Sequence, residues 1–397
     1  MIYLFEDFFL DPDRRELRRG ADLVPVEPQV FDVLECLVRN HERLVSKDDL
    51  IARVWGGRIV GESTLSSRIA LARQAIGDSG KDQRLIRTIT RKGFRFVAAV
   101  TESGGAESSA AIARDKVALA ALHQDIRYCQ THDGVRLAYA IAGQGPPLVK
   151  TGNWLQHLEY DWESPVWRHV LRGFAKDHTL VRYDARGNGM SDWNVDELSL
   201  DAWVSDLETV VAATGINRFP LLGISQGCAV SIAYAVRHPD RVSHLILYGG
   251  YALGAKKRTP QEKDMRNAML TLARLEWGSD NPAFRQLFTG NFIPGATPEQ
   301  AHFFNELQRR STSPECAARY MDATGDFDIT ELLGRVRAPT LVMHVRDDLM
   351  VPVECGRELA AGIPSAQFVT LPGRNHFFLE HEIASQRFFD EIKLFLG

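Results

Sequence analysis

The 397-residue chain lacks the long apolar run, about 18 residues or more, that a membrane-crossing helix needs. A secretory leader is not expected either, because Met1 leads into sequence containing Asp and Arg rather than into a basic segment and an apolar core. Neither a transmembrane helix nor a signal peptide is therefore expected. These absences predict a cytoplasmic protein with no membrane partner.

Cysteine is scarce as well. The chain has five, which are Cys36, Cys129, Cys228, Cys316 and Cys355. They lie far apart, are odd in number and form no C-x-x-C motif, which argues against a disulfide framework and against a zinc site. We therefore expect a protein of a reducing compartment, with no metal ion and no cofactor.

The chain also has no strong net charge, with 47 basic and 51 acidic residues. This balance excludes a uniformly basic nucleic-acid binder, but it hides one patch. Residues 62–95 hold eight basic and three acidic side chains, so a single segment is basic. The length predicts two or three domains.

Residues 1–100 predict a small α+β domain. Pro28 is favoured at the first position of a helix, and Ser46 is a good N-cap for a second helix over 47–55. A third helix begins near Ser63 and ends at Gly77. Short strands are expected within 3–26 and at 85–90 and 94–97, and the last two are joined by a basic tip at 91–93.

This order of strands, three helices and basic hairpin resembles the winged helix-turn-helix domain of OmpR/PhoB-type transcription regulators. The most specific segments are 63–69, 76–78 and 90–96. CadC/ToxR-type regulators begin with a similar domain, but a membrane span follows there and none is expected here. The resemblance implies binding to double-stranded promoter DNA. The alternative is a winged helix that contacts protein and whose charges are only solvated.

In this family the third helix lies in the major groove and the hairpin touches the DNA backbone or minor groove. The helix wheel agrees, since Ser63, Ser67, Ala70 and Gln74 lie opposite the apolar stripe Leu65, Ile69, Ala72 and Ile76. By position, the resemblance implies these DNA contacts: Ser63, Ser66, Ser67, Arg68, Arg73 and Gln74 from the helix, and Thr90, Arg91, Lys92 and Arg95 from the hairpin. Because one small winged helix reads few bases, a homodimer is expected.

Residues 101–125 are predicted to be a linker, because their first part is small and polar. The Ala-rich stretch 110–123 is interpreted as a short helix that is either a spacer or a dimer contact. Residues 126–397 alternate strand and helix patterns, which predicts an α/β domain with a doubly wound, mostly parallel sheet. A strand-free stretch at about 251–328, rich in aromatic residues, predicts a helical cap over that sheet.

The central motif of this domain is G-x-S-x-G at Gly223–Gly227. An apolar run precedes it and a helical pattern follows it, which is the strand, sharp turn and helix context in which the motif indicates a nucleophile. A serine hydroxyl is a poor nucleophile unless a histidine, oriented by a carboxylate, takes its proton. Together with D-x-R-G-x-G-x-S-D at 184–192, this order of parts resembles the α/β-hydrolase fold.

That resemblance implies a catalytic triad of Ser225, Asp348 and His376, with Asp347 as the fallback acid. It also implies an oxyanion hole made by the backbone N–H groups of Gln226 and Asn153, with Trp154 as an alternative to Asn153. Asp184 and Arg186 are interpreted as braces of their loop. The substrate pocket is expected to include Trp154, His157, Trp277, Phe288 and Phe292.

A serine nucleophile, rather than an aspartate, favours esters, thioesters, lactones or C–C bonds as substrates. The two domains together predict a one-component transcription regulator that binds a promoter and binds, with possible hydrolysis, a small apolar ligand. The alternative is a serine esterase with an accessory winged helix that tethers or regulates it.

Overall fold

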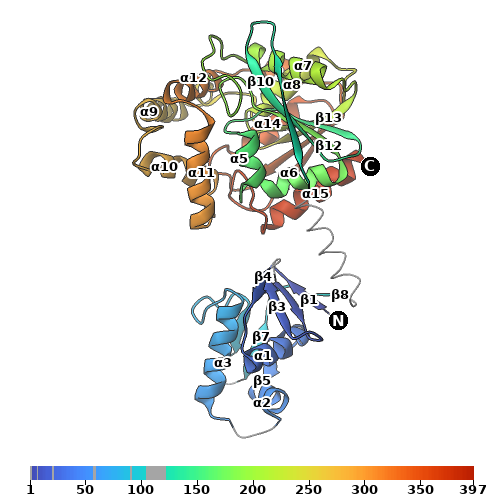
Figure 1. Ribbon diagram of the computed structural model, residues 1–397, viewed down its shortest axis with the longest axis vertical. Helices are drawn as coiled ribbons and strands as arrows, with labels where there is room; N and C mark the ends of the chain where they lie inside the picture. Colours follow the sequence, from blue (N-terminus) through green and yellow to red (C-terminus); the bar gives the residue numbers. More distant parts are fainter. Residues whose placement is uncertain (1, 7, 20–21, 57–59, 90–91, 104–121) are drawn as a thin grey trace. The chain divides into compact units, whose positions relative to one another are not determined.

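The computed structural model describes residues 2–6, 8–19, 22–56, 60–89, 92–103 and 122–397 (Figure 1). The chain forms two compact units that divide between residues 120 and 121. Thr90, Arg91 and most of the stretch 110–123 lie outside the described residues. Among the helices that are described, none is long and apolar enough to cross a membrane.

The N-terminal unit contains an antiparallel sheet with the order β4-β3-β2-β1-β8. Its last strand pairs with the first, with Thr101 opposite Leu4 and Ser103 opposite Ile2. The first three residues of the predicted linker, 101–103, thus pair along β1, where their small polar composition is no obstacle. The strands are β1 (Ile2–Phe5), β2 (Phe8–Asp11), β3 (Glu16–Arg19), β4 (Asp22–Val24) and β8 (Thr101–Ser103).

Three helices follow the first four strands, as the sequence predicts: α1 (Pro28–Arg39), α2 (Lys47–Trp55) and α3 (Glu62–Ala75). Pro28 occupies the first position of α1. The hydroxyl of Ser46 accepts a hydrogen bond from the Asp49 N–H at 3.0 Å, and the Asp49 carboxylate accepts one from the Ser46 N–H. Two of the N–H groups at the start of α2 are thus satisfied by side chains.

A three-stranded sheet, β5-β7-β6, completes this unit. Its strands are β5 (Val45–Ser46), β6 (Ile86–Ile89) and β7 (Gly93–Phe96). A Cβ on Gly93 would lie 2.1 Å from the carbonyl oxygen of Val45, so only glycine lets β7 pass this close to β5. Phe96 packs against Phe5 in the core of the unit, which joins the hairpin to the first sheet.

The C-terminal unit is built on an eight-stranded sheet with the order β16-β15-β14-β13-β11-β12-β10-β9. The strands from β11 onward pair in parallel, whereas β10 pairs antiparallel with both β12 and β9. This confirms the predicted mostly parallel sheet. The strands are β9 (Gln124–Gln130), β10 (Arg136–Ala142), β11 (Pro147–Lys150), β12 (Thr179–Tyr183), β13 (Phe219–Ile224), β14 (Val242–Tyr248), β15 (Thr340–Val345) and β16 (Gln367–Leu371).

Helices cover both faces of this sheet. Thr151, just after β11, approaches Ser231 of α8 (Gly227–Arg237) with 2.6 Å between their hydroxyl oxygens. The preceding residue, Lys150, points the other way, with Nζ 5.7 Å from the ring centre of Trp167 at the start of α6 (Arg168–Asp177). Further helices are α5 (Leu158–Glu163), α7 (Leu200–Thr214), α14 (Val353–Gly362) and α15 (Ile383–Leu396).

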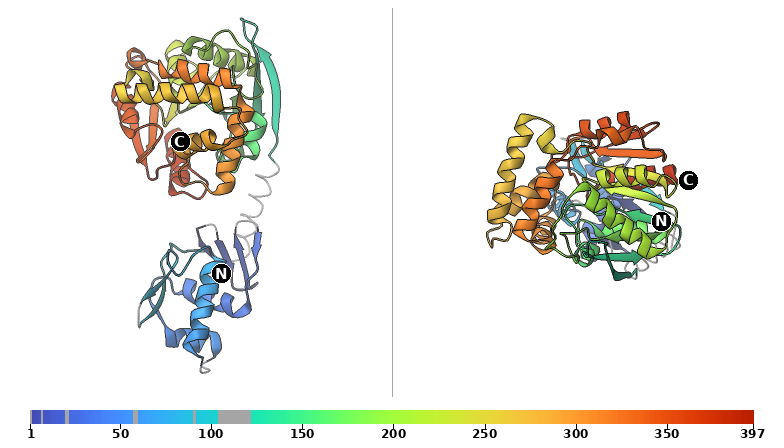
Figure 2. Two further views of the ribbon diagram at one scale, coloured as in Figure 1. Left: turned by 90° about the vertical axis from the view of Figure 1, so that its left-hand side faces the viewer. Right: turned by 90° about the horizontal axis from the view of Figure 1, so that it is seen from above.

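The segment predicted to form the cap is helical, and its helices gather on one side of the unit (Figures 1 and 2). They are η1 (Ala255–Lys257), α9 (Pro260–Glu276), α10 (Ala283–Phe292), α11 (Pro298–Ser311) and α12 (Pro314–Gly325), and α13 (Thr330–Leu333) follows. An isolated bridge between Leu253 and Asp328 ties the two ends of the cap together.

Candidate active site and DNA-binding face

Ser225 lies in the sharp turn between β13 and α8. Its φ of 55° is in the left-handed region, and its N–H donates to the Tyr248 carbonyl at 2.8 Å. A Cβ on Gly223 would lie 2.6 Å from the Ser231 hydroxyl oxygen, and one on Gly227 would lie 2.8 Å from the Gly152 carbonyl. The glycines of the motif are therefore required by close approach of the neighbouring backbone and helix.

The structure brings Ser225, His376 and Asp348 together. Nε2 of His376 is 3.0 Å from the Ser225 Oγ, and Nδ1 is 2.6 Å from an Asp348 oxygen. Asp348 comes from the loop after β15, and His376 comes from the loop after β16. The imidazole is fully buried, and Asp347, the fallback acid, is exposed.

Several contacts fix the His376 ring. The backbone N–H of His376 donates to the Phe292 carbonyl at 2.7 Å, and the backbone carbonyl of His376 accepts from the Tyr248 hydroxyl at 2.6 Å. The Phe292 ring meets the imidazole edge-on at 5.4 Å. A Cβ on Gly249 would lie 3.0 Å from Cε1 of the imidazole, so a glycine follows β14 where the ring packs.

The Asp348 carboxylate is held as an anion. Burial alone would raise its pKa, but the His376 ring, a contact with His344 and the Val351 N–H outweigh burial and lower the pKa below its usual range. The Met350 and Val351 N–H groups donate to one carboxylate oxygen at 2.8 and 3.0 Å. His344 lies 3.6 Å from the other oxygen and hydrogen-bonds the Val351 carbonyl.

The predicted oxyanion loop contains a contact that the sequence analysis missed. The Asn153 N–H donates to the side-chain Oε1 of Gln156 at 2.9 Å, so this amide is occupied by the chain itself. The loop nevertheless lies against the elbow, because the Gly152 carbonyl blocks a Cβ on Gly227.

Four of the five predicted pocket residues form one buried aromatic cluster, which comprises Trp154, Trp277, Phe288 and Phe292. Through Phe292 this cluster reaches His376. A residue that was not predicted, Tyr320, joins it to the elbow: its ring lies 4.6 Å from that of Trp154, and its hydroxyl accepts from the Gln226 side chain at 3.1 Å.

His157 has a different place. Its Nδ1 accepts from the Tyr160 N–H at 3.3 Å and so caps the start of α5. The ring also stands 6.4 Å from that of Tyr160. His157 therefore caps the N-terminus of α5, and its place in the pocket stays a prediction.

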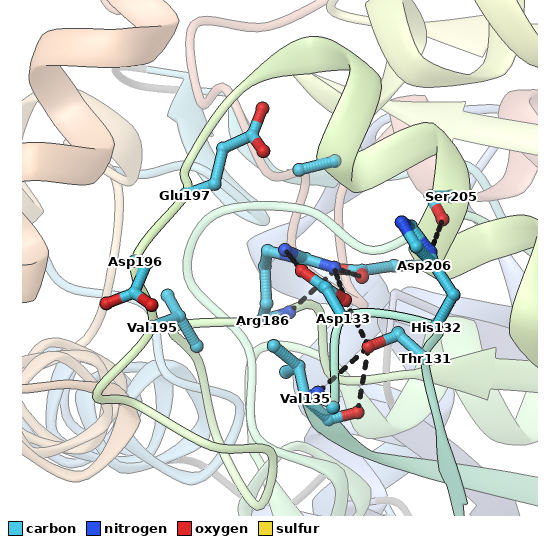
Figure 3. Close-up of polar contacts among 12 residues, drawn as sticks. Thr131, His132, Asp133, Val135, Arg186, Val195, Asp196, Glu197, Ser205 and Asp206 are labelled. Carbon is cyan, nitrogen blue, oxygen red and sulfur yellow. Dashed lines mark hydrogen bonds and ion pairs between the residues drawn. The ribbon is translucent and has the colours of Figure 1, made fainter.

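The loop after β12 is braced as interpreted from the sequence (Figure 3). Arg186 is buried between two carboxylates, 2.7 Å from an oxygen of Asp133 and 2.8 Å from one of Asp206. Asp184 accepts from the N–H groups of Leu158 and Met190 at 3.0 and 2.8 Å. Both side chains are occupied in holding the loop.

In the N-terminal unit, α3 shows the two faces that the helix wheel predicts. Leu65, Ile69, Ala72 and Ile76 are buried, whereas Ser63, Ser66, Ser67, Ala70 and Gln74 are exposed. An exposed polar strip therefore runs along the helix that the family uses to read the major groove. Lys92 and Arg95 of the hairpin are exposed as well.

The arginines of α3 depart from expectation. Arg73 is buried and donates to the Ile86 carbonyl at 2.8 and 3.1 Å and to the Thr88 hydroxyl at 2.8 Å. This corrects the expectation that Arg73 contacts DNA. Arg68 is half-buried and its guanidinium is paired with the Glu27 carboxylate, which leaves it less available than a free cation.

With this geometry established, comparison with known families assigns both units. The chain matches the alpha/beta hydrolase fold family over residues 160–382. It matches the family described as transcriptional regulatory protein, C terminal, over residues 21–96. The protein belongs to the alpha/beta hydrolase fold family and carries an OmpR/PhoB-type winged-helix domain in its N-terminal unit.

Individual relatives and solved structures agree with the α/β-hydrolase fold of this chain. AB hydrolase superfamily protein YisY of Bacillus subtilis is 26% identical over 260 residues, which cover 64% of this chain and 94% of the relative. Pyrrolizixenacetamide deacetylase of Xenorhabdus hominickii is 27% identical, covering 59% and 86%. A hydrolase from Pseudomonas aeruginosa PA01 superposes with a TM-score of 0.59 at 26% identity, covering 69% and 98%. An enol-lactonase from Burkholderia xenovorans LB400 shares the fold, with a TM-score of 0.57 at 22% identity, covering 68% and 99%.

Proposed function

We propose that the protein is a transcription regulator whose winged helix binds promoter DNA and whose hydrolase domain binds and hydrolyses a small apolar ligand. Ester, thioester and lactone ligands fit a serine nucleophile. The observation that carries the hydrolytic half is the continuous chain from the Ser225 oxygen through the His376 ring to the Asp348 carboxylate.

In the proposed reaction, Ser225 attacks the carbonyl carbon of the ligand while Nε2 of His376 takes its proton. Asp348 holds the imidazole with Nδ1 protonated and stabilises the imidazolium that forms. The same proton then passes to the leaving group, and water attacks the acyl group on Ser225 in the second half of the reaction. The Gln226 N–H, at the start of α8, stabilises the oxyanion of each tetrahedral intermediate.

The aromatic cluster under the cap supports an apolar ligand, because such side chains contribute binding through buried area rather than through charge. Two of the similar proteins carry names of related chemistry: one is a deacetylase and the other an enol-lactonase. Removal of an acetyl group and opening of a lactone both break the bond between a carbonyl carbon and a leaving group, and we propose this reaction class for the present chain.

For the DNA-binding half, the exposed strip Ser63, Ser67 and Gln74 supports base contacts, and Lys92 and Arg95 support contacts with phosphates. We propose that two copies of the chain bind two half-sites, because a single recognition helix contacts only a few base pairs. In this scheme the ligand of the hydrolase domain sets the regulatory state of the DNA-bound dimer.

The direct test treats the full-length protein with a fluorophosphonate, which reacts with activated serines, and locates the adduct by mass spectrometry. We expect one adduct, on Ser225, and turnover of short p-nitrophenyl esters. An unmodified Ser225 together with no ester turnover would contradict the hydrolytic half. Failure to retain any fragment from a pool of random duplex DNA at moderate salt would contradict the regulatory half.

The second candidate function is a serine esterase with an accessory winged helix. The observation that favours it is the completeness of the hydrogen-bonded triad, which a pure receptor does not need. Under this reading, ester turnover is independent of DNA and the winged helix selects no particular DNA sequence from the pool.

A further inference from the structure

Lys150 is an unexpected residue at its position. It ends β11 in the interior of the central sheet, and its side chain is buried. Burying an amine costs free energy unless the group is paired, and an apolar side chain would fill a sheet position without that cost. The presence of a lysine here therefore needs a reason beyond packing.

The contacts of Lys150 point to the oxyanion loop. Its Nζ donates to the side-chain oxygen of Asn153 and lies 3.4 Å from the carbonyl oxygen of Thr151. The Asn153 N–H in turn donates to Gln156, which closes a turn over 153–156. The Gly152 carbonyl of the same loop lies against the elbow glycine Gly227. The lysine thus anchors the loop that faces Ser225.

Charged groups surround the lysine from each neighbouring element. Arg182 of β12 pairs in register with Lys150, Asp161 comes from α5, and Asp184 follows β12. One Asp161 oxygen lies 3.9 Å from the Arg182 guanidinium. Burial lowers the pKa of Lys150 to about 8; Asp161 and Asp184 oppose this fall, and Arg182 adds to it.

Building on the hydrolase function proposed above, we propose that Lys150 is a positioning residue for the oxyanion side of the site. Its ammonium holds the Asn153 carboxamide and thereby fixes the backbone of the loop against the elbow. In this role it touches no substrate. Its effect is on rate, because a misplacement of about 1 Å in a catalytic site costs roughly a hundredfold.

The test compares Lys150→Met, Asn153→Ala and the double variant in the full chain, with p-nitrophenyl butyrate as the probe. Each single variant is expected to lower kcat about tenfold to a hundredfold, with KM changed by less than about twofold. The double variant should be no slower than the slower single variant, because both changes break one contact. Lys393→Met, at an exposed lysine of α15, is the matched control and should leave kcat unchanged.

The pH profile separates positioning from a purely structural role. If the ammonium is needed, kcat of the wild type falls as pH rises through about 8, and this limb is absent in Lys150→Met. Stability changes in the opposite direction. The pKa of Lys150 is lower in the folded chain than in the unfolded chain, so the unfolded chain binds more protons between pH about 8 and 10.5. The contribution of Lys150 to the free energy of unfolding therefore rises with pH over this range. A lysine that acts only in folding would leave kcat of the folded protein without an alkaline limb near pH 8.

A second variant covers the case in which Lys150→Met does not fold. Asn153→Asp keeps an acceptor for the ammonium and adds a negative charge, so it should retain turnover and move the alkaline limb to higher pH. Losses of kcat that multiply in the double variant would overturn the positioning role of Lys150 and leave the proposed hydrolase function intact. An alkaline limb of kcat that is unchanged in Lys150→Met would do the same. A wild type that forms no fluorophosphonate adduct and turns over no ester overturns the hydrolase function as well.

Discussion

The hydrolase site and the recognition helix of this protein are built in opposite ways. Ser225, His376 and Asp348 are buried and bonded to one another, whereas Ser63 and Gln74 of α3 face solvent. A catalytic group must be held by its own fold before the substrate arrives. A groove-reading group must instead be available to a partner. Contacts within the chain therefore identify the first kind of site, and helix phase and exposure identify the second.

The largest effect that tests this contrast is that of Ser225→Ala. It should lower ester turnover by about 10⁴-fold or more, since removal of a triad nucleophile leaves only binding and oxyanion stabilisation. Affinity for a DNA fragment that the wild type selects should stay within about twofold. The measurements are steady-state turnover and DNA binding by fluorescence anisotropy at fixed salt.

The regulatory consequence of Ser225→Ala separates the two candidate functions. If ligand-dependent regulation of a reporter promoter survives while turnover is lost, the hydrolase domain acts first as a sensor. Loss of regulation together with turnover indicates that the reaction itself is the signal. Turnover that persists in the variant would show that Ser225 is not the nucleophile.

Gln74→Ala should give the largest change on the exposed side of the comparison. Gln74 lies at the solvent face of α3, and a carboxamide that donates and accepts at one base edge discriminates bases by about 1–3 kcal/mol. The selected DNA site should become less specific at one or two base pairs, as read by repeating the selection. Gln286→Ala, at an exposed glutamine of the cap helix α10, is the control and should select the same site as the wild type.

Arg73 sharpens the contrast because its side chain is buried and hydrogen-bonded within the chain, although it lies on the helix that carries the exposed polar strip. Arg73→Met should destabilise the N-terminal unit by about 1–3 kcal/mol, since hydrogen bonds to the Ile86 carbonyl and the Thr88 hydroxyl are lost. Hydrogen exchange of α3 reports that loss. At a temperature where the unit stays folded, DNA affinity should be within about threefold of the wild type. A large loss of affinity with unchanged exchange would restore Arg73 to the DNA contacts.

The sequence predicted those parts of the molecule that depend on short-range pattern. G-x-S-x-G marked the Ser225 turn because close backbone approach excludes other residues at Gly223 and Gly227. The resemblance to the α/β-hydrolase fold placed Asp348 and His376 in loops that follow parallel strands, and such loops meet at one sheet edge. The apolar stripe of α3 repeats with the period of a helix, and this period also predicted which face of α3 is exposed.

What the sequence did not predict depends on contacts between distant segments. Arg73 lies four residues after Ile69, at the border of the apolar stripe, and only the position of β6 decides that its guanidinium turns inward. The bond from the Asn153 N–H to Gln156, and the burial of Lys150 beside Asp161, need the fold of the loop before α5. A lysine within an apolar strand was the one available signal for that cluster.

The smallest expected effect concerns Lys92 and Arg95 of the hairpin. Both are exposed, and each phosphate contact that is lost removes about 0.9 from the slope of log affinity against log salt. Lys92→Ala with Arg95→Ala should therefore lower the magnitude of this slope by about 1.8 for each bound copy of the chain, without changing the selected sequence, because phosphates carry no base information. Lys263→Ala with Arg274→Ala, two exposed positions of α9 in the cap, removes the same charge from the hydrolase unit and should leave the slope unchanged. Equal slopes in the two variants would mean that the hairpin acts only through net charge. The division between a DNA-reading unit and a ligand-binding unit would then rest on the recognition helix alone.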